Sequence, residues 1–220
     1  MSLSIVVEGN IGSGKSTLLS ILKDMFPDNL EILYEPVKEW QEMKNKDGTN
    51  LLGVFYNDIS RYSYLFQSVA FRTRVKKMLE PLTKPIRIIE RSPYADRYCF
   101  AQNCYESGMM TDIEWEDYTK WFDWLNDSFK IESKINGYIY LDCSSDTSFE
   151  RIGIRERREE ISIKREYLDD LNTKYRDWIS TQNNVLILDA NQNFEHNEKI
   201  REKFINDISE FIKNLKVGIK

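Results

Sequence analysis

The sequence predicts an α/β fold in which a five-stranded parallel sheet carries helices on both faces. Five short apolar segments alternate with longer segments whose apolar residues recur at helical spacing. None of the connecting segments has the composition of a linker between domains, so residues 1–220 are expected to form one domain. Apolar residues make up 41% of the chain, which is enough for a sizeable core and argues against disorder.

The first predicted strand, residues 3–7, leads into a segment with the pattern G-x-x-x-x-G-K-S/T of the phosphate-binding P-loop. The segment consists of Gly9, Asn10, Ile11, Gly12, Ser13, Gly14, Lys15 and Ser16. Thr17 then continues into a predicted helix that runs to about Phe26. Backbone N–H groups of such a loop bind an anion, Lys15 would reach the β- and γ-phosphates of ATP, and Ser16 would bind Mg²⁺. The alternative is a glycine-rich turn that binds no ligand.

The other strands are short, apolar and rich in β-branched residues, as is typical of buried parallel strands. They are expected at residues 30–34, 86–89, 137–141 and 185–188. A polar stretch over residues 41–50, with Asp47-Gly48 marking a turn, separates the second strand from the first long helical segment.

The remaining helices are predicted from apolar spacing and from residues that begin helices. They are expected over residues 51–79 with a break near 57–60, from about 146 into the arginine-rich segment 151–158, over 164–182, and from 195 onward. Ser92 before Pro93 is typical of an N-cap followed by proline at the first helical position. Thr111 and Glu114 form a predicted capping box, which begins a helix that runs to about Phe129.

Composition and charge exclude several classes of function. The net charge of −5 argues against a nucleic-acid footprint and against an anionic membrane partner. No apolar stretch approaches the roughly 18 residues of a membrane-spanning helix, and the polar residues Glu8 and Asn10 come too early for a signal peptide. The single histidine, His196, leaves any acid–base chemistry to carboxylates. A reduced, cytoplasmic setting is predicted by three cysteines without metal-binding spacing: Cys99, Cys104 and Cys143.

Charged residues follow the second and third predicted strands, where the carboxyl ends of a parallel sheet bind ligands. Glu35 could accept the proton of a hydroxyl that attacks a γ-phosphoryl group. Glu90 could hold Mg²⁺ directly or through water, and Arg91 could orient Glu35 or the attacking hydroxyl. The alternatives are a surface acid at Glu35, and at Glu90 an acid that interacts with the following helix N-terminus.

The long helical segment carries polar residues on one face. Gln67, Ala70 and Arg74 share that face, and Gln67 offers a donor and an acceptor suited to the edge of a base. Ala70 would leave room beside it, and Arg74 could pair with Asp96. The alternative is an exposed polar stripe with an ordinary ion pair. Nearby aromatic residues could be core or could wall a flat ligand: Trp40, Phe55, Tyr56 and Phe100.

The segment 151–160 is rich in arginine. Arg151 and Arg155 lie one helical turn apart and could neutralise the phosphates of a transferred group. Helical spacing favours Arg158 as the third arginine of that face. A solvated, salt-bridged helix is the alternative.

Taken together, these motifs resemble the deoxynucleoside kinases, in the branch of the deoxycytidine and deoxyguanosine kinases. The resemblance spans nearly the full length. It includes Glu8-Gly9-Asn10-Ile11, Glu35-Pro36-Val37 with Trp40, Asn50-Leu51-Leu52, Phe66-Gln67, Glu90-Arg91-Ser92, Asp96-Arg97-Tyr98, Tyr138-Ile139-Tyr140-Leu141, Glu159-Glu160 and Glu166-Tyr167-Leu168. The resemblance implies a P-loop kinase fold with an arginine-rich lid, Mg²⁺ as cofactor, ATP or UTP as phosphate donor, and a homodimer built on helices.

The resemblance also implies roles for individual residues. Glu35 would be the base for the 5′-hydroxyl, assisted by Arg91, and Ser16 and Glu90 would serve Mg²⁺. Tyr56 and Glu160 would bind the 3′-hydroxyl. The base would be read by Gln67 and stacked by Phe100, within an acceptor site that includes Val37, Trp40, Leu52, Phe55 and Ala70. The lid would use Arg151, Arg155 and Arg157, so the resemblance favours Arg157 over Arg158. Asn193 and Phe194 would contact the donor base.

Arg74 and Asp96 predict the substrate preference, because thymidine-preferring relatives have smaller or uncharged residues there. An ionised Asp96 accepts from the exocyclic amine of cytosine or adenine but repels O4 of thymine. Deoxycytidine and purine deoxynucleosides are therefore the expected substrates, with thymidine poor. The chain departs from the family at Pro93, at the shorter segment 41–49 and at the lid end 161–165.

Two other functions compete with this interpretation. A nucleoside monophosphate kinase needs an arginine site for the acceptor phosphate, which the Glu35 carboxylate would repel. A nucleotide-dependent switch or an inactive binding module would not need Lys15, Ser16, Glu35 and Glu90 together.

Overall fold

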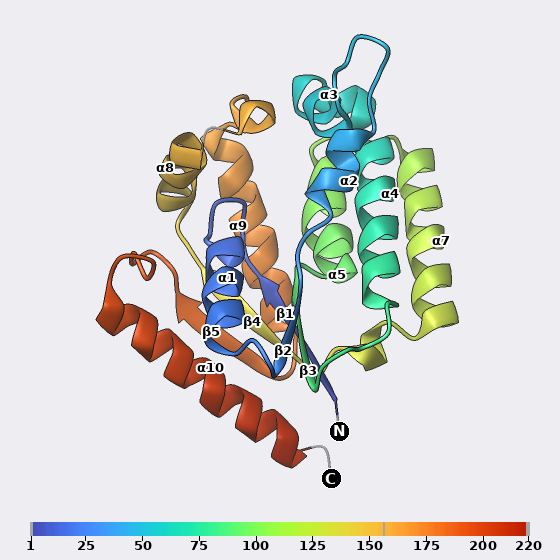
Figure 1. Ribbon diagram of the computed structural model, residues 1–220. Helices are drawn as coiled ribbons and strands as arrows, with labels where there is room; N and C mark the ends of the chain where they lie inside the picture. The colour runs from blue at the N-terminus through green and yellow to red at the C-terminus, as the bar shows by residue number, and fades with distance from the viewer. Residues whose placement is uncertain (1, 156, 219–220) are drawn as a thin grey trace.

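The central feature of the fold is one parallel sheet with the strand order β2-β3-β1-β4-β5. The computed structural model describes residues 2–155 and 157–218 (Figure 1). The strands are β1 Leu3–Glu8, β2 Leu30–Leu33, β3 Ile86–Glu90, β4 Gly137–Asp142 and β5 Val185–Asp189. In the register of the sheet, Val7 of β1 lies beside Glu90 of β3 and Ile139 of β4. The α/β class with five parallel strands is therefore confirmed.

Both faces of the sheet are covered, because successive side chains of a strand point to opposite faces. Ile5 and Val7 of β1 belong to a core cluster with α1 (Lys15–Met25) and α10 (Glu198–Gly218). Val6 belongs to the opposite cluster, formed mainly by α3 (Leu51–Asn57), α4 (Ile59–Met78), α7 (Asp112–Phe129) and α9 (Arg165–Ser180). The helices α4 and α7 run side by side on that second face (Figure 1). None of the described helices is long and apolar enough to cross a bilayer.

The helix starts predicted at Ser92 and at Thr111, and the break predicted near residues 57–60, are confirmed. The Ser92 side chain accepts a hydrogen bond from Ala95 N at the start of α5 (Pro93–Ala95). Thr111 and Glu114 form the capping box of α7. The break in the long segment falls at Asp58, whose carboxylate accepts a hydrogen bond from Arg61 N and begins α4.

The sequence pattern missed α2 (Val37–Glu42) and the 3₁₀ turn at Glu132–Lys134. It placed Asp96 on the helix that begins at Pro93, but not the π-helical turn (Asp96–Ala101) and α6 (Gln102–Glu106) that continue this helix. The π-helical turn continues α5 and brings Asp96 and Phe100 toward the carboxyl ends of the strands. Short elements of this kind carry too few periods for apolar spacing to identify them.

The last helix begins later than the apolar spacing predicts, at Glu198 rather than about residue 195. The amide side chain of Asn193 accepts a hydrogen bond from His196 N at 3.1 Å, and that of Asn197 accepts one from Ile200 N at 3.3 Å. The Asn193 side chain supports a turn at residues 194–196, and the Asn197 side chain caps the helix that follows, so α10 begins at Glu198.

The arginine-rich segment begins within α8 (Ser145–Arg155) and ends in a 3₁₀ turn at Arg158–Glu160. Residue 156, which the sequence pattern assigned to the preceding helix, lies outside the described residues, as do residues 1, 219 and 220. Arg157 has extended backbone, so the helical spacing of Arg151 and Arg155 does not continue to Arg158.

Candidate active site

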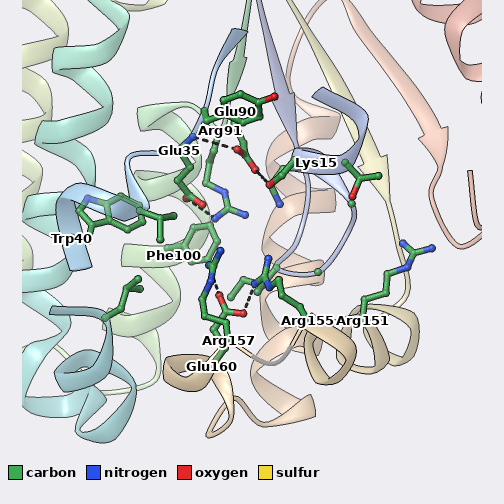
Figure 2. A pocket seen from close by; sticks show the side chains of 18 of the residues that line it. Lys15, Glu35, Trp40, Glu90, Arg91, Phe100, Arg151, Arg155, Arg157 and Glu160 are labelled. Carbon is green, nitrogen blue, oxygen red and sulfur yellow. Dashed lines mark hydrogen bonds and ion pairs between the residues drawn. The ribbon is translucent and has the colours of Figure 1, made fainter. Parts of the chain in front are cut away.

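A cavity of about 640 Å³ lies at the carboxyl ends of the strands (Figure 2). Most of the residues predicted from the sequence line it. They are Ile11, Gly12, Gly14, Lys15, Ser16, Thr17, Glu35, Val37, Trp40, Leu52, Phe55, Tyr56, Gln67, Arg74, Glu90, Arg91, Asp96, Phe100, Arg151, Arg155, Arg157, Glu160, Asn193 and Phe194. Segments that are far apart in the chain therefore meet in one site, as expected at the carboxyl ends of the strands in a parallel sheet.

Four predicted residues lie behind the cavity wall instead. The Asn10 amide donates to the Leu168 carbonyl at 2.8 Å, which attaches the P-loop to α9. Ser13 Oγ lies 3.4 Å from the Lys15 ammonium, and the Gly9 carbonyl accepts from that ammonium at 3.0 Å. Ala70 is fully buried in the core, so it does not line the cavity but gives α4 a thin wall there.

Glycine is required at two positions of the P-loop, because other segments of the chain lie very close to the loop backbone there. Gly12 has φ 78°, and a Cβ there would lie 2.5 Å from the Ser148 carbonyl oxygen. Gly14 has φ 92°, and a Cβ there would lie 2.9 Å from the Phe194 ring. Any larger residue would therefore push the loop away from α8 and from the segment that follows β5.

Lys15, Ser16 and Glu90 meet at the start of α1. The Lys15 ammonium donates to the Gly9 and Asn10 carbonyls, and burial together with the charge of Arg91 lowers its pKa to about 7. Ser16 Oγ donates to Glu90 Oε1 at 2.6 Å. A hydroxyl and a carboxylate are oxygen ligands of the kind that Mg²⁺ prefers, so this pair fits the cation that the sequence predicts.

The Glu35 carboxylate follows β2 and contacts two arginines through the same oxygen. Arg74 and Arg91 both donate to Oε1, the latter at 3.2 Å. Burial favours the neutral acid, but the charges of Arg91, Arg74 and Lys15 outweigh it and lower the pKa of Glu35 to about 2. Within the described residues Oε2 has no hydrogen-bond donor, so it can accept one from a hydroxyl in the cavity. The contact with Arg74 was not expected from the sequence.

The far end of the cavity holds acceptor atoms. Arg74 forms the expected ion pair with Asp96 and lies 5.0 Å from the centre of the Trp40 ring. Burial raises the pKa of Asp96 to about 6, although Arg74 opposes that shift. Gln67 Oε1 and Asp96 Oδ2 are buried without a hydrogen-bond partner among the described residues. Both are acceptors, so this end of the cavity suits a ligand that presents N–H donors.

The arginine-rich segment forms the opposite wall. Arg155 and Arg157 both donate to the Glu160 carboxylate, the latter at 2.7 Å (Figure 2). Arg151 lies apart from them and donates to the Ala190 carbonyl at 2.8 Å. Arg157 lines the cavity and Arg158 does not. Of the two candidates for the third lid arginine, the one that lines the cavity is therefore Arg157, which the resemblance favours, and not Arg158, which helical spacing favours.

Sequence reasoning missed six residues that line the cavity: Tyr34, Phe66, Ile154, Tyr167, Glu195 and His196. Phe66 stacks on Phe55 with ring centres 4.4 Å apart, and its apolar character gave no reason to separate it from the core. The Tyr167 hydroxyl is buried without a partner in the described structure. Phe66 and Tyr167 belong to motifs that carry the family resemblance, which is the signal that could have identified them.

The chain is similar to proteins of known activity over most of its length. The sequence model of the family described as deoxynucleoside kinase matches residues 5–213. Deoxycytidine kinase of Homo sapiens is 35% identical, with 96% of this chain and 91% of that protein covered. The probable deoxycytidine kinase of Fowlpox virus is 36% identical, with 96% and 88% covered. The mitochondrial deoxyguanosine kinase of Xenopus laevis is 31% identical, with 95% and 89% covered.

Proposed function

The chain belongs to the deoxynucleoside kinase family and is a phosphotransferase, and we propose that it transfers the γ-phosphoryl group of ATP to the 5′-hydroxyl of a deoxynucleoside in nucleotide salvage. The Glu35 carboxylate is the observation that carries this proposal. It lies between two arginines beside the P-loop, with one oxygen available to a hydroxyl. A hydroxyl acceptor needs such a group, whereas a phosphate acceptor would be repelled by it.

Glu35 acts chiefly by orientation in this proposal. A pKa of about 2 makes it fully ionised at neutral pH but a weak base. Phosphoryl transfer passes through a loose transition state, in which the hydroxyl stays largely protonated until the new P–O bond forms. Oε2 therefore holds the hydroxyl in line by accepting its hydrogen bond, and takes the proton once bond formation has made it acidic.

The donor side uses the P-loop and the lid. Lys15 and the loop N–H groups bind the β- and γ-phosphates, and Ser16 and Glu90 hold Mg²⁺, which neutralises phosphate charge when bound. Arg151, Arg155 and Arg157 close over the transferred group in this proposal. Asn193 and Phe194, at the donor end of the cavity, contact the donor base, with UTP as the alternative donor to ATP.

The acceptor side uses the opposite wall. Tyr56, Glu160 and Glu35 all line the cavity, and burial and the charges of the two carboxylates raise the pKa of the Tyr56 hydroxyl. Tyr56 and Glu160 are proposed to bind the 3′-hydroxyl, since a phenol and a carboxylate together satisfy its donor and its acceptor. Stacking on the base falls to Phe100, within walls formed by Val37, Trp40, Leu52 and Phe55.

Base preference follows from the acceptor atoms of Gln67 and Asp96. Cytosine and adenine present an exocyclic amine, and guanine presents N1–H and an amine, whereas thymine presents O4 where cytosine has the amine. Deoxycytidine, deoxyadenosine and deoxyguanosine are therefore the proposed substrates, and thymidine the poor one. The unpartnered state of Gln67 Oε1 and Asp96 Oδ2 supports this preference, because a buried acceptor gains most from a donor.

Initial rates with deoxycytidine and with deoxycytidine monophosphate as acceptors, each with ATP and with UTP and Mg²⁺, test the reaction. The proposal expects the nucleoside to be phosphorylated and the monophosphate to be a poor acceptor. Faster turnover of the monophosphate would instead indicate a monophosphate kinase. Nucleotide binding without phosphorylation of either acceptor would indicate a switch or a binding module.

A homodimer and a cytoplasmic location complete the proposal. Trp121 and Trp124 of α7 are 53% and 56% exposed, and this apolar surface supports a dimer built on the helices of that face. The described cysteines are free and buried, which supports a reducing compartment. In this proposal, residues 1–220 form a single kinase domain. Sedimentation of the purified chain tests the dimer.

A further inference from the structure

Glu8, the last residue of β1, is a fully buried carboxylate that the proposed reaction does not use. Burial raises its pKa to about 7, against the hydrogen bonds from Ser92 and the charge of Arg91. Removing a carboxylate from water is costly unless its oxygens are satisfied. A carboxylate that ends an otherwise apolar strand therefore calls for a specific reason, and its contacts supply one.

The contacts of Glu8 converge on one turn. Its Oε1 accepts hydrogen bonds from Ser92 N at 2.8 Å and from Ser92 Oγ at 2.6 Å. Ser92 Oγ in turn accepts from Ala95 N at 3.2 Å and begins α5. Its other oxygen, Oε2, accepts one long hydrogen bond from the described part of the chain, from the Tyr175 hydroxyl at 3.4 Å. Glu8 thus fixes the residue that directly follows Arg91.

Arg91 adopts a backbone conformation that an arginine does not choose freely. Its φ is 64°, in the left-handed region, which is unfavourable for a residue other than glycine. Its N–H donates to the Val7 carbonyl at 3.0 Å, so β1 holds the turn on one side through Val7 and on the other through Glu8. Such conformations persist only where the surroundings over-determine them.

The Arg91 side chain shows what the turn achieves. Its guanidinium donates to the Gly9 carbonyl at 3.0 Å and to Glu35 at 3.2 Å, and lies 4.5 Å from the centre of the Phe100 ring (Figure 2). A guanidinium has a fixed geometry, so these contacts all depend on the direction in which the backbone projects the side chain. A turn that relaxed to an ordinary φ would point it elsewhere.

We propose that Glu8 is a positioning residue for phosphoryl transfer, which acts by holding the Arg91–Ser92 turn so that Arg91 reaches Glu35. The inference rests on the proposed function, because it concerns the arginine that assists Glu35. Its rival is a residue that merely stabilises the fold or the adjacent P-loop. The rival predicts that Glu8 and Arg91 act independently, whereas the proposal predicts that the effect of Glu8 passes through Arg91.

A double-mutant cycle distinguishes the two. Glu8→Met keeps about the size of the side chain but removes the oxygen that accepts both Ser92 hydrogen bonds, and it is measured with Arg91 intact and in an Arg91→Ala background. The proposal expects kcat with deoxycytidine to fall about 10-fold when Arg91 is present and less than about two-fold when it is absent. KM for ATP is expected to stay unchanged, because the P-loop keeps its own contacts. Equal losses in both backgrounds, or no loss in either, would overturn the inference.

Two further variants make the test specific. Tyr175→Phe removes only the contact at Oε2 and keeps the ring, so kcat is expected to stay within about two-fold of the parent. An equal loss in Tyr175→Phe would attribute the effect to the buried charge rather than to the turn, and would also overturn the inference. If Glu8→Met does not fold, as thermal denaturation will reveal, Ser92→Ala takes its place in the same cycle. Failure of the parent chain to phosphorylate deoxycytidine would count against the proposed function instead.

Discussion

The floor of the cavity, formed by Glu35, Glu90 and Arg91 at the strand ends, differs from the lid, residues 151–160, in how its charges are held. The floor residues are mostly buried, and each contacts the backbone or a side chain of a neighbouring strand end. Their positions are therefore set by the sheet itself. A group fixed in this way needs no rearrangement when the substrate binds, which is the condition for strong electrostatic stabilisation of a transition state.

Two of the lid arginines, Arg155 and Arg157, are held by the Glu160 carboxylate and not by the sheet. The side chains of Arg155 and Arg157 are 36% and 28% exposed, and both contact Glu160. Under the proposed function, Glu160 binds the acceptor and the two arginines bind donor phosphates. The lid would therefore exchange its contacts when both substrates are present, whereas the floor would keep its own. Substitutions in the floor are therefore expected to lower kcat more than substitutions in the lid.

Replacement of Glu35 by glutamine is the largest expected effect. It removes the negative oxygen proposed to hold the 5′-hydroxyl, so kcat with deoxycytidine should fall about 10³-fold. The matched control is Glu39→Gln, an exposed carboxylate on α2, which should leave kcat unchanged. Steady-state rates of both variants measure the difference. Unchanged turnover in Glu35→Gln would show that the Glu35 carboxylate does not take part in the reaction.

A smaller effect is expected from the lid. Arg157→Ala removes a proposed phosphate contact and should lower kcat about 10²-fold. Arg158→Ala should change it by no more than about two-fold, because that side chain is exposed and does not line the cavity. Rates of the two variants at saturating deoxycytidine provide the measurement. A larger loss of kcat in Arg158→Ala than in Arg157→Ala would indicate that Arg158 is the third lid arginine, as helical spacing predicts.

At the far end of the cavity, which holds Arg74 and Asp96, substitutions should change the ratio of kcat/KM between two nucleosides more than either rate by itself. The double variant Arg74→Met with Asp96→Ala removes the charges proposed to reject thymine, so kcat/KM for thymidine relative to deoxycytidine should rise about 10-fold. Rates with both nucleosides should fall, because Arg74 also contacts Glu35. A constant ratio in a folded double variant would show that other residues read the base.

Stability should depend on pH with opposite signs for two buried carboxylates. Glu8 has its pKa raised by burial from 4.5 to about 7, so its contribution is full below pH 4.5 and is lost as the pH rises through 7. Glu35 has its pKa lowered to about 2, chiefly by Arg91 and Arg74 against the effect of burial, so its contribution is lost as the pH falls toward 2.

The measurement is the free energy of unfolding of the parent chain and of Glu8→Gln between pH 4.5 and 7. The parent should lose up to about 3 kcal/mol more than the variant across this range. Glu39→Gln serves as the control, since an exposed carboxylate should leave the slope unchanged. Identical slopes for the parent and Glu8→Gln would contradict the raised pKa of Glu8.

The same contrast separates what the sequence could predict from what it could not. Glu35 and Glu90 were identified because the carboxyl ends of parallel strands meet at one edge of the sheet. The contact between Arg74 and Glu35 was not, because it depends on how a helix far along the chain packs over that edge. Arg157 replaced Arg158 because α8 ends at Arg155 and helical spacing no longer applies.

Other differences arose where short elements or polar side chains override apolar spacing. The six-residue helix α2 follows a proline that reads as the end of a strand, and it carries Val37 and Trp40 into the cavity. Glu8 gave no sign of its contacts, since its partner Ser92 is distant in the sequence and adjacent only across the sheet. The sequence therefore indicates which groups reach the site, and the structure indicates which groups hold them.

The central claim is that the cavity accepts a deoxynucleoside whose base presents N–H donors to Gln67 and Asp96. Its most direct test is kcat/KM for deoxycytidine, deoxyadenosine, deoxyguanosine and thymidine with ATP and Mg²⁺, measured on one preparation of the chain. The account predicts that thymidine has the lowest value of the four. A value for thymidine above those of the other three would contradict it.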